Sequence, residues 1–272
     1  MKQRLDPSGV QTSSFIFIAL AGRSIVIMPR TPQELCKYHV KNLRAIDDAK
    51  DQVSGLLRQA IKTDDKRTRD VLVRLLALLL AAWAECRLRK LLYEHEHFSA
   101  QDRTKITGAG SQLQQWEMAV EVAFRKHYNR PHGPLDSPNF PRSAFTQYTD
   151  INRMLDTDLR AVILLRNRLS HGQWIYTLNE AGTEVDTRLM RVLRTETILS
   201  LQAKTNLLLH LANIIQELVV SPPTFQRNFD HYYRSIEENR LRLSNTRDEY
   251  QRYVTMMKDR HQRGQQRARA TS

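Results

Sequence analysis

The chain has 272 residues, of which 26% are charged and 41% hydrophobic, and this ordinary globular composition excludes wholesale disorder. It carries 42 Lys and Arg against 29 Asp and Glu, which gives a formal net charge of +13. Such an excess of positive charge predicts an acidic partner, most often nucleic acid, with a merely soluble basic protein as the alternative.

The N-terminal stretch contains only a short apolar run, which extends from Phe15 to Gly22 and is broken at Arg23. A run of this length cannot span a bilayer, and it lies too far from the basic start to make a good signal peptide. Residues 1–27 are therefore predicted to be a loose N-terminal extension or an artefact of start-site choice. The folded protein is expected to begin near Met28.

A long helix is predicted to begin with Thr31 as its N-cap. Pro32 then occupies the first helical position, and Glu34 has the spacing of a capping box. Apolar residues recur at helical intervals along one side as far as Ile61. The helix is expected to end in the polar stretch that follows.

The second predicted helix spans about residues 65–95. It is apolar nearly all round between residues 71 and 83, as expected for a helix at the centre of a bundle. Arg74, together with the charged residues from Glu85 onward, leaves too short an uncharged run for a transmembrane span. No association with a membrane is expected.

The middle of the chain alternates between loops and helices. Residues 99–112 are predicted to form a loop, and residues 113–128 to resume a helix. Prolines and a glycine in residues 129–143 predict the longest irregular connection of the chain. A fourth helix is expected from roughly residue 144 or 149 to His171, with Gly172 as a left-handed C-cap.

The remaining sequence predicts a hairpin and two further helical segments. β-prone residues flank Asn179 to Gly182, which favours a small β-hairpin directly after the fourth helix. Residues 195–221 form an amphipathic pattern that the next two prolines end, and residues 223–272 read as a charged helix fading into a basic tail. We expect an all-α antiparallel helical bundle over residues 28–222, with residues 223–272 as a charged helical extension and basic tail.

The segment LLRNRLSHGQWIY, residues 164–176, places polar side chains at the end of an otherwise apolar helix. On a regular helix Arg166 and His171 lie about 140° apart and cannot share a face, whereas Asn167 and His171 can. The arginine and the histidine therefore need an unwound last turn, or partners from another helix or another subunit. The negative end of the helix dipole favours the charged form of His171 near neutral pH.

A glutamate lies on the apolar face of the second helix. Glu85 belongs to a series at steps of three and four residues, with Leu78, Ala81, Leu88 and Leu92. A buried carboxylate needs a cationic partner. Arg89 lies within reach four residues on, and Arg166 is the preferred partner across the bundle. We expect Glu85 to orient Arg166 towards a phosphate.

RNRLSHG at a helix end in a basic bundle resembles the R-x4-6-H motif of the HEPN superfamily, with the polar residue commonly found after the arginine present as Asn167. The layout of roughly residues 31–220 is similar to that of prokaryotic HEPN ribonucleases of toxin and phage-defence systems. The resemblance implies a metal-independent endoribonuclease, without a cofactor, whose active site forms where two protomers bring their motif helices together. It implies that Arg166 and His171 are catalytic and that Asn167 supports them, while Glu85 is added from its placement.

These residue types suit RNA cleavage. The 2′-OH of RNA is the nucleophile, so a metal-free reaction needs a proton acceptor, a proton donor and a cation beside the phosphate. Histidine accepts or donates protons near pH 7, and a guanidinium matches phosphate oxygens. One His171 per chain supplies one such group, whereas a homodimer supplies two. RNA, a second copy of the chain, and a cognate antitoxin or other defence-system protein are the expected partners.

Further RNA contacts are expected from residues beside the motif and in the C-terminal tail: Arg168, Ser170, Arg260 and Arg263. Ser170 can instead serve as a helix-end hydroxyl, and the tail with Arg260 and Arg263 can simply aid solubility. The two cysteines show neither a disulfide framework nor a zinc-ligand spacing, which favours a reducing, cytoplasmic location. The alternatives to an enzyme are a noncatalytic RNA-binding or partner-binding module and an immunity subunit.

Overall fold

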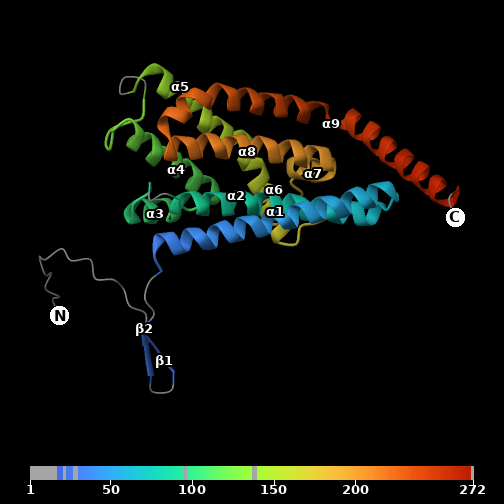
Figure 1. Cartoon of the computed structure of the whole chain (residues 1–272), viewed down its shortest axis with the longest axis horizontal. Coiled ribbons are helices and arrows are strands. Elements are labelled where there is room, and N and C mark those ends of the chain that lie inside the picture. The colour runs from blue at the N-terminus through green and yellow to red at the C-terminus, as the bar shows by residue number, and fades with distance from the viewer. Residues whose placement is uncertain (1–16, 21–22, 27–29, 95–96, 137–139, 271–272) are drawn as a thin grey trace, which may run out of the picture.

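The structure is a computed structural model that describes residues 17–20, 23–26, 30–94, 97–136 and 140–270. The elements in chain order are β1 (Phe17–Leu20), β2 (Arg23–Val26), α1 (Pro32–Lys62), α2 (Lys66–Tyr93), α3 (Ala100–Thr107), α4 (Gln112–His127), α5 (Arg142–Met154), the π-helical turn η1 (Leu155–Leu159), α6 (Arg160–Ser170), α7 (Thr187–Thr195), α8 (Ile198–Val220) and α9 (Pro222–Ala270). Every named element from Pro32 onward is helical, which confirms the all-α class for this part of the chain (Figure 1).

The predicted N-terminal extension, residues 1–27, lies largely outside the described residues. Within it, the backbones of β1 and β2 pair in antiparallel register, with Phe17 opposite Val26 and Leu20 opposite Arg23. Figure 1 draws this pair as two arrows.

The α1–α2 pair has the predicted helix start. The Thr31 hydroxyl accepts a hydrogen bond from the Glu34 N–H (3.2 Å), and the Glu34 carboxylate accepts one from the Thr31 N–H (2.9 Å), so the capping box is confirmed. At the other end Asp64 has a left-handed backbone (φ 57°), and the Asp65 side chain caps α2. The chain therefore turns back within three residues, and α2 packs along α1.

The α8–α9 pair forms the opposite side of the bundle. Ser221 alone separates the two helices, because Pro222 and Pro223 end α8 and occupy the first positions of α9, where proline is tolerated. Phe225, Phe229 and Ile236 of α9 are buried in the same core as the preceding helices. The predicted fading into a tail is wrong for the described residues, because α9 continues as a helix to Ala270.

The core lies between these two helical pairs, where α6 packs against α2, α4 and η1 pack against α8, and α5 packs against α4 and η1. In Figure 1, α1 and α2 run along one side of the bundle and α8 and α9 along the other. Leu80, Phe124, Met154 and Ile214 are buried there. In the described chain, no helix combines the length and the apolar character that crossing a membrane requires.

Two local predictions are corrected. Residues 99–112 are not simply a loop, because the Ser99 and Asp102 side chains form a capping box that starts α3. The predicted hairpin after α6 is reduced to one antiparallel bridge between Leu178 and Val185. The chain then enters α7, which begins with Asp186 as N-cap and buries its apolar side, Leu189, Met190 and Leu193.

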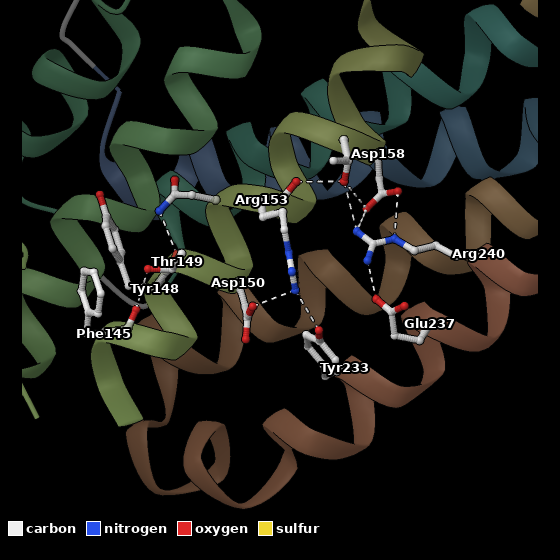
Figure 2. Close-up of polar contacts among 11 residues, drawn as sticks. Phe145, Tyr148, Thr149, Asp150, Arg153, Asp158, Tyr233, Glu237 and Arg240 are labelled. Carbon is white, nitrogen blue, oxygen red and sulfur yellow. Dashed lines mark hydrogen bonds and ion pairs between the residues drawn. The ribbon is translucent and has the colours of Figure 1, made fainter. Parts of the chain in front are cut away.

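The turn η1 is fixed to α9 by arginine contacts (Figure 2). Arg240 of α9 forms an ion pair with Asp158 and donates a hydrogen bond to the Thr157 hydroxyl (3.1 Å). One turn earlier, Arg153 donates to the Tyr233 hydroxyl (2.8 Å). Since α6 continues directly from η1, these contacts fix the position from which α6 starts.

Candidate functional site

The residues of the motif lie on the last turns of α6. The apolar side chains of this helix, Val162, Ile163, Leu165 and Leu169, are buried in the core. Arg166 and Asn167 lie at the edge of the buried face and are half-buried, whereas His171 is exposed just beyond the helix. The core side chains thus fix the helix and leave the polar residues at its end accessible.

The end of α6 is a Schellman motif, as the predicted C-cap requires. Gly172 has a φ of +78°, a conformation that glycine adopts without steric cost. Its N–H donates to the Leu169 carbonyl (3.1 Å), and the Gln173 N–H donates to the Arg168 carbonyl (3.0 Å). The Trp174 indole N–H also donates to the Leu169 carbonyl (2.9 Å). The loop after the motif is therefore fastened to the last turn of α6.

Arg166 is held by two neighbours. Its Nη2 lies 3.4 Å from Glu85 Oε2 on α2, and its Nη1 donates to Asn167 Oδ1 at 3.2 Å. The structure thus has the ion pair across the bundle that the sequence predicts between Arg166 and Glu85. About a third of the Arg166 side chain (34%) is exposed, which leaves part of the guanidinium accessible to a ligand.

The expectation of a buried Glu85 is wrong. Its side chain is 40% exposed, because α6 covers only one side of the α2 face that carries it. The neighbouring Cys86 is half-buried, and its thiol pKa is raised by burial and by the charge of Glu85. The carboxylate thus lies at the edge of the core, where both water and a ligand reach it.

His171 is the C-cap residue of α6. Its backbone N–H donates to the Asn167 carbonyl (3.2 Å), and its own backbone has left the α-helical conformation (φ −93°, ψ 19°). Within the part of the chain that the structure describes, no hydrogen bond or ion pair joins its ring to Arg166. One copy of the chain therefore joins the side chains of Arg166, Asn167 and Glu85, and among the described residues it forms no bond between the His171 ring and Arg166.

The two residues predicted as RNA contacts beside the motif have local roles. The Ser170 hydroxyl donates to the Asn167 carbonyl (3.0 Å), which is the helix-end role that was the alternative for it. Arg168 is half-buried, and its carbonyl accepts the Schellman hydrogen bond. Both lie next to Arg166 and His171 in the chain, and their contact with RNA stays a prediction.

Arg260 and Arg263 lie on the exposed last turns of α9. Arg263 donates from Nε to the Asp259 carbonyl (3.3 Å), and Arg260 lines a surface hollow together with Lys62. Figure 1 shows this end of α9 projecting beyond the bundle, whereas α6 lies within it. The structure does not bring these arginines to the motif, so any contact they make with RNA is separate from it.

Another group of arginines was missed by the sequence analysis. Arg69 and Arg74 of α2 and Arg194 of α7 line one cavity of about 590 Å³. A signal for one of them is present in TRLMRVLRT, where an arginine recurs at every third position, as on one side of a helix. That the α2 arginines lie beside it depends on tertiary structure.

Within the described residues, no three His, Cys, Asp or Glu side chains are grouped as a metal site would require. Comparison of the chain with protein-family models, with curated proteins and with solved structures finds no match.

Proposed function

We propose that the protein is an endoribonuclease of the HEPN type, which cleaves RNA without a metal ion through attack by the 2′-OH. The observation that carries the proposal is the end of α6, where a partly exposed Arg166, oriented by Glu85 and Asn167, lies one and a half turns from an exposed His171. The proposed cellular role is that of a toxin or a phage-defence effector.

The proposed reaction uses the nucleophile that RNA provides. The 2′-oxygen forms a bond to phosphorus as the bond from phosphorus to the 5′-oxygen breaks, which leaves a 2′,3′-cyclic phosphate and a 5′-hydroxyl. His171 takes the proton from the 2′-OH or delivers one to the departing 5′-oxygen. The Arg166 guanidinium contacts the phosphate oxygens, whose negative charge increases in the transition state.

Two copies of the chain are proposed to complete the site. The reaction needs a proton acceptor and a proton donor, and each chain supplies one His171 at the motif. Two further observations support association at this end of α6: the ring of His171 has no partner within its own described chain, and the apolar side chains of Leu164 and Ile175 nearby are exposed. A twofold arrangement also supplies a second Arg166.

A noncatalytic module for binding RNA or a partner protein, such as an antitoxin or immunity subunit, is the second candidate. It is favoured by the local bonds of the motif, since an Arg166 paired with Glu85 and a Ser170 bonded to the helix end also fit a purely structural brace. Such a module retains the bundle and its positive charge without needing His171.

The substitution His171→Ala tests the proposal. Purified protein is incubated with varied single-stranded RNAs in EDTA, and the fragments are analysed for cyclic phosphate ends. Loss of a general acid or base is expected to lower the rate by about 10²- to 10⁴-fold, with the fold and RNA binding retained. His132→Ala in the exposed loop before α5 is the matched control and should cleave normally. If the wild-type dimer leaves every RNA uncut, or if His171→Ala cleaves as fast as the wild type, the enzyme proposal is wrong.

A further inference from the structure

Two neighbouring hollows share the last turn of α7. The first, called the arginine cavity here, measures about 590 Å³ and is lined by α2, by the end of α7, by Thr197 before α8 and by α9. The second, the Tyr176 hollow, measures about 490 Å³ and is lined by Tyr176, Val185 and the outer side of α7. Arg194 and Thr195 line both hollows, so they adjoin one another.

The arginine cavity has an excess of positive charge. Arg69, Arg74 and Arg194 line it together with two carboxylates, Asp70 and Glu196. The Glu196 carboxylate is buried and ion-paired with Lys204 of α8, and it accepts a hydrogen bond from the Ser200 hydroxyl, so its charge is compensated inside the protein. Asp70 forms an ion pair with Arg69 (3.8 Å), so no carboxylate in the lining is left to balance Arg74 and Arg194. The cavity therefore favours an anionic ligand.

Arg194 and Arg74 have donor groups that are free to bind such a ligand, whereas Arg69 is paired with Asp70. Arg194 is exposed, and its side chain has no hydrogen bond or ion pair with any residue that the structure describes. Arg74 donates from Nη1 to the Asp70 carbonyl (2.9 Å), but its buried Nε has no partner. Guanidinium groups with unused donors match the oxygens of phosphate groups.

Aromatic rings accompany the charges. Tyr176 in the second hollow is 59% exposed, although tyrosine rings usually bury most of their surface. Tyr250 of α9 lies in the wall of the arginine cavity beside Arg69. Arg191 and Arg194 of α7 line the Tyr176 hollow together with Tyr176 itself. Proteins that bind single-stranded nucleic acids combine positive charge along the backbone with rings on which bases stack.

The hollows begin close to the motif and extend away from it. Tyr176 follows His171 by five residues, so their Cα atoms are separated by at most about 18 Å. The Tyr176 hollow is lined from Thr187 to Thr195, a length of about 12 Å of helix, and the arginine cavity continues beyond Arg194. A ligand that occupies both hollows is a chain rather than a single nucleotide.

We propose that the Tyr176 hollow and the arginine cavity together form a groove that binds the phosphate backbone of single-stranded RNA beside the motif. The direction of the strand, from the end of α6 across α7 towards α9, rests on the proposed function. Binding of RNA in the groove does not depend on the proposed function, because it needs only the charges and aromatic rings that line the groove.

The experiment measures RNA binding by fluorescence anisotropy with a labelled single-stranded RNA of 12 nucleotides. All variants carry His171→Ala so that binding is measured without cleavage. Arg194→Ala is the test, because this exposed side chain makes no described contact whose loss would unfold the protein. Arg188→Ala is the matched control, since Arg188 has the same charge and exposure on the same helix but lines neither hollow.

Arg194→Ala is expected to weaken binding roughly tenfold and to lower the salt dependence of log K by about 0.7, the effect of one lost phosphate contact on a single strand. Arg188→Ala should change affinity by less than about twofold. The groove is contradicted if both variants weaken binding equally, if neither does, or if the labelled RNA does not bind at all.

Cleavage by the chain with its native His171 is then measured separately. If Arg194→Ala raises KM while kcat is retained, both proposals stand. If binding depends on Arg194 but the wild type leaves RNA uncut, the groove stands and the ribonuclease proposal fails. If the wild type cleaves RNA but Arg194→Ala leaves KM unchanged, the groove proposal is wrong and the ribonuclease proposal stands.

Discussion

Glu85→Gln is expected to separate the effect of the Arg166–Glu85 ion pair on stability from its effect on cleavage. The charged atoms lie 3.4 Å apart, with 34% and 40% of the two side chains exposed. At this separation the Coulomb energy in water is about 1.2 kcal/mol, and the lost side-chain freedom reduces the net contribution to about 0.5 kcal/mol. The amide should therefore cost the fold little.

The assay for stability is a double-mutant cycle with Glu85→Gln, Arg166→Gln and the double variant, each unfolded in urea and followed by circular dichroism. The coupling free energy should be about 0.5 kcal/mol at low salt and should approach zero in about 1 M NaCl, where charges are screened beyond about 3 Å. RNA cleavage by Glu85→Gln should nevertheless fall about tenfold or more, because a less restrained Arg166 is misplaced against the phosphate.

Two results would refute this reasoning. A coupling free energy above about 2 kcal/mol that salt does not change would mean that the pair is desolvated and serves the fold. Unchanged cleavage by Glu85→Gln, measured on the same preparation, would show that Glu85 does not orient Arg166.

Other predictions concern stability. Asp158→Asn is expected to lower the unfolding free energy by about 2 kcal/mol, because it removes the charge opposite a partly buried Arg240. Asp156→Asn, which affects an exposed ion pair, should lower it by less than about 1 kcal/mol. Equal losses for the two variants in urea unfolding would contradict this prediction. Burial lowers the pKa of three half-buried histidines, His39, His127 and His210. Below about pH 6.5 they take up protons more readily in the unfolded chain, so the unfolding free energy should fall from pH 7 to pH 5, and a flat profile would contradict it.

The ends of helices could be predicted from the sequence because the groups that cap them lie within a few residues of one another. Thr31 and Glu34 start α1 with mutual hydrogen bonds, and Gly172 ends α6 in a left-handed conformation. The all-α class follows from apolar residues at helical spacing, which is also a local property.

Elements that depend on packing could not be predicted in this way. Gly108 and Gly110 favour a loop, yet α3 forms beside them because Phe98 and Ile106 are buried in the core. The predicted hairpin depended on β-prone residues, yet only the bridge between Leu178 and Val185 forms, and the chain then enters α7, which packs against α6. The π-helical turn η1 leaves no signature in the sequence, since its contact with Arg240 joins residues 82 positions apart.

The candidate site was predictable in part. Glu85 interrupts an apolar face, and a charge at such a position needs a partner, which identified Arg166. The exposure of Glu85 depends on how much of α2 is covered by α6, and the grouping of Arg69 and Arg74 with Arg194 depends on how α7 lies against α2. Neither property can be obtained from the spacing of residues along the chain.

The length of α9 makes it a mechanical connection between distant parts of the protein. Arg240 holds η1 at the start of the motif helix, Tyr250 forms part of the wall of the arginine cavity, and Lys258 forms an ion pair with Asp64 (2.7 Å) in the turn between α1 and α2. Eighteen residues of unbroken helix, about 27 Å, separate the first of these contacts from the last. A single unbroken helix therefore braces the start of the motif helix, one wall of the arginine cavity and the turn between α1 and α2 at the same time.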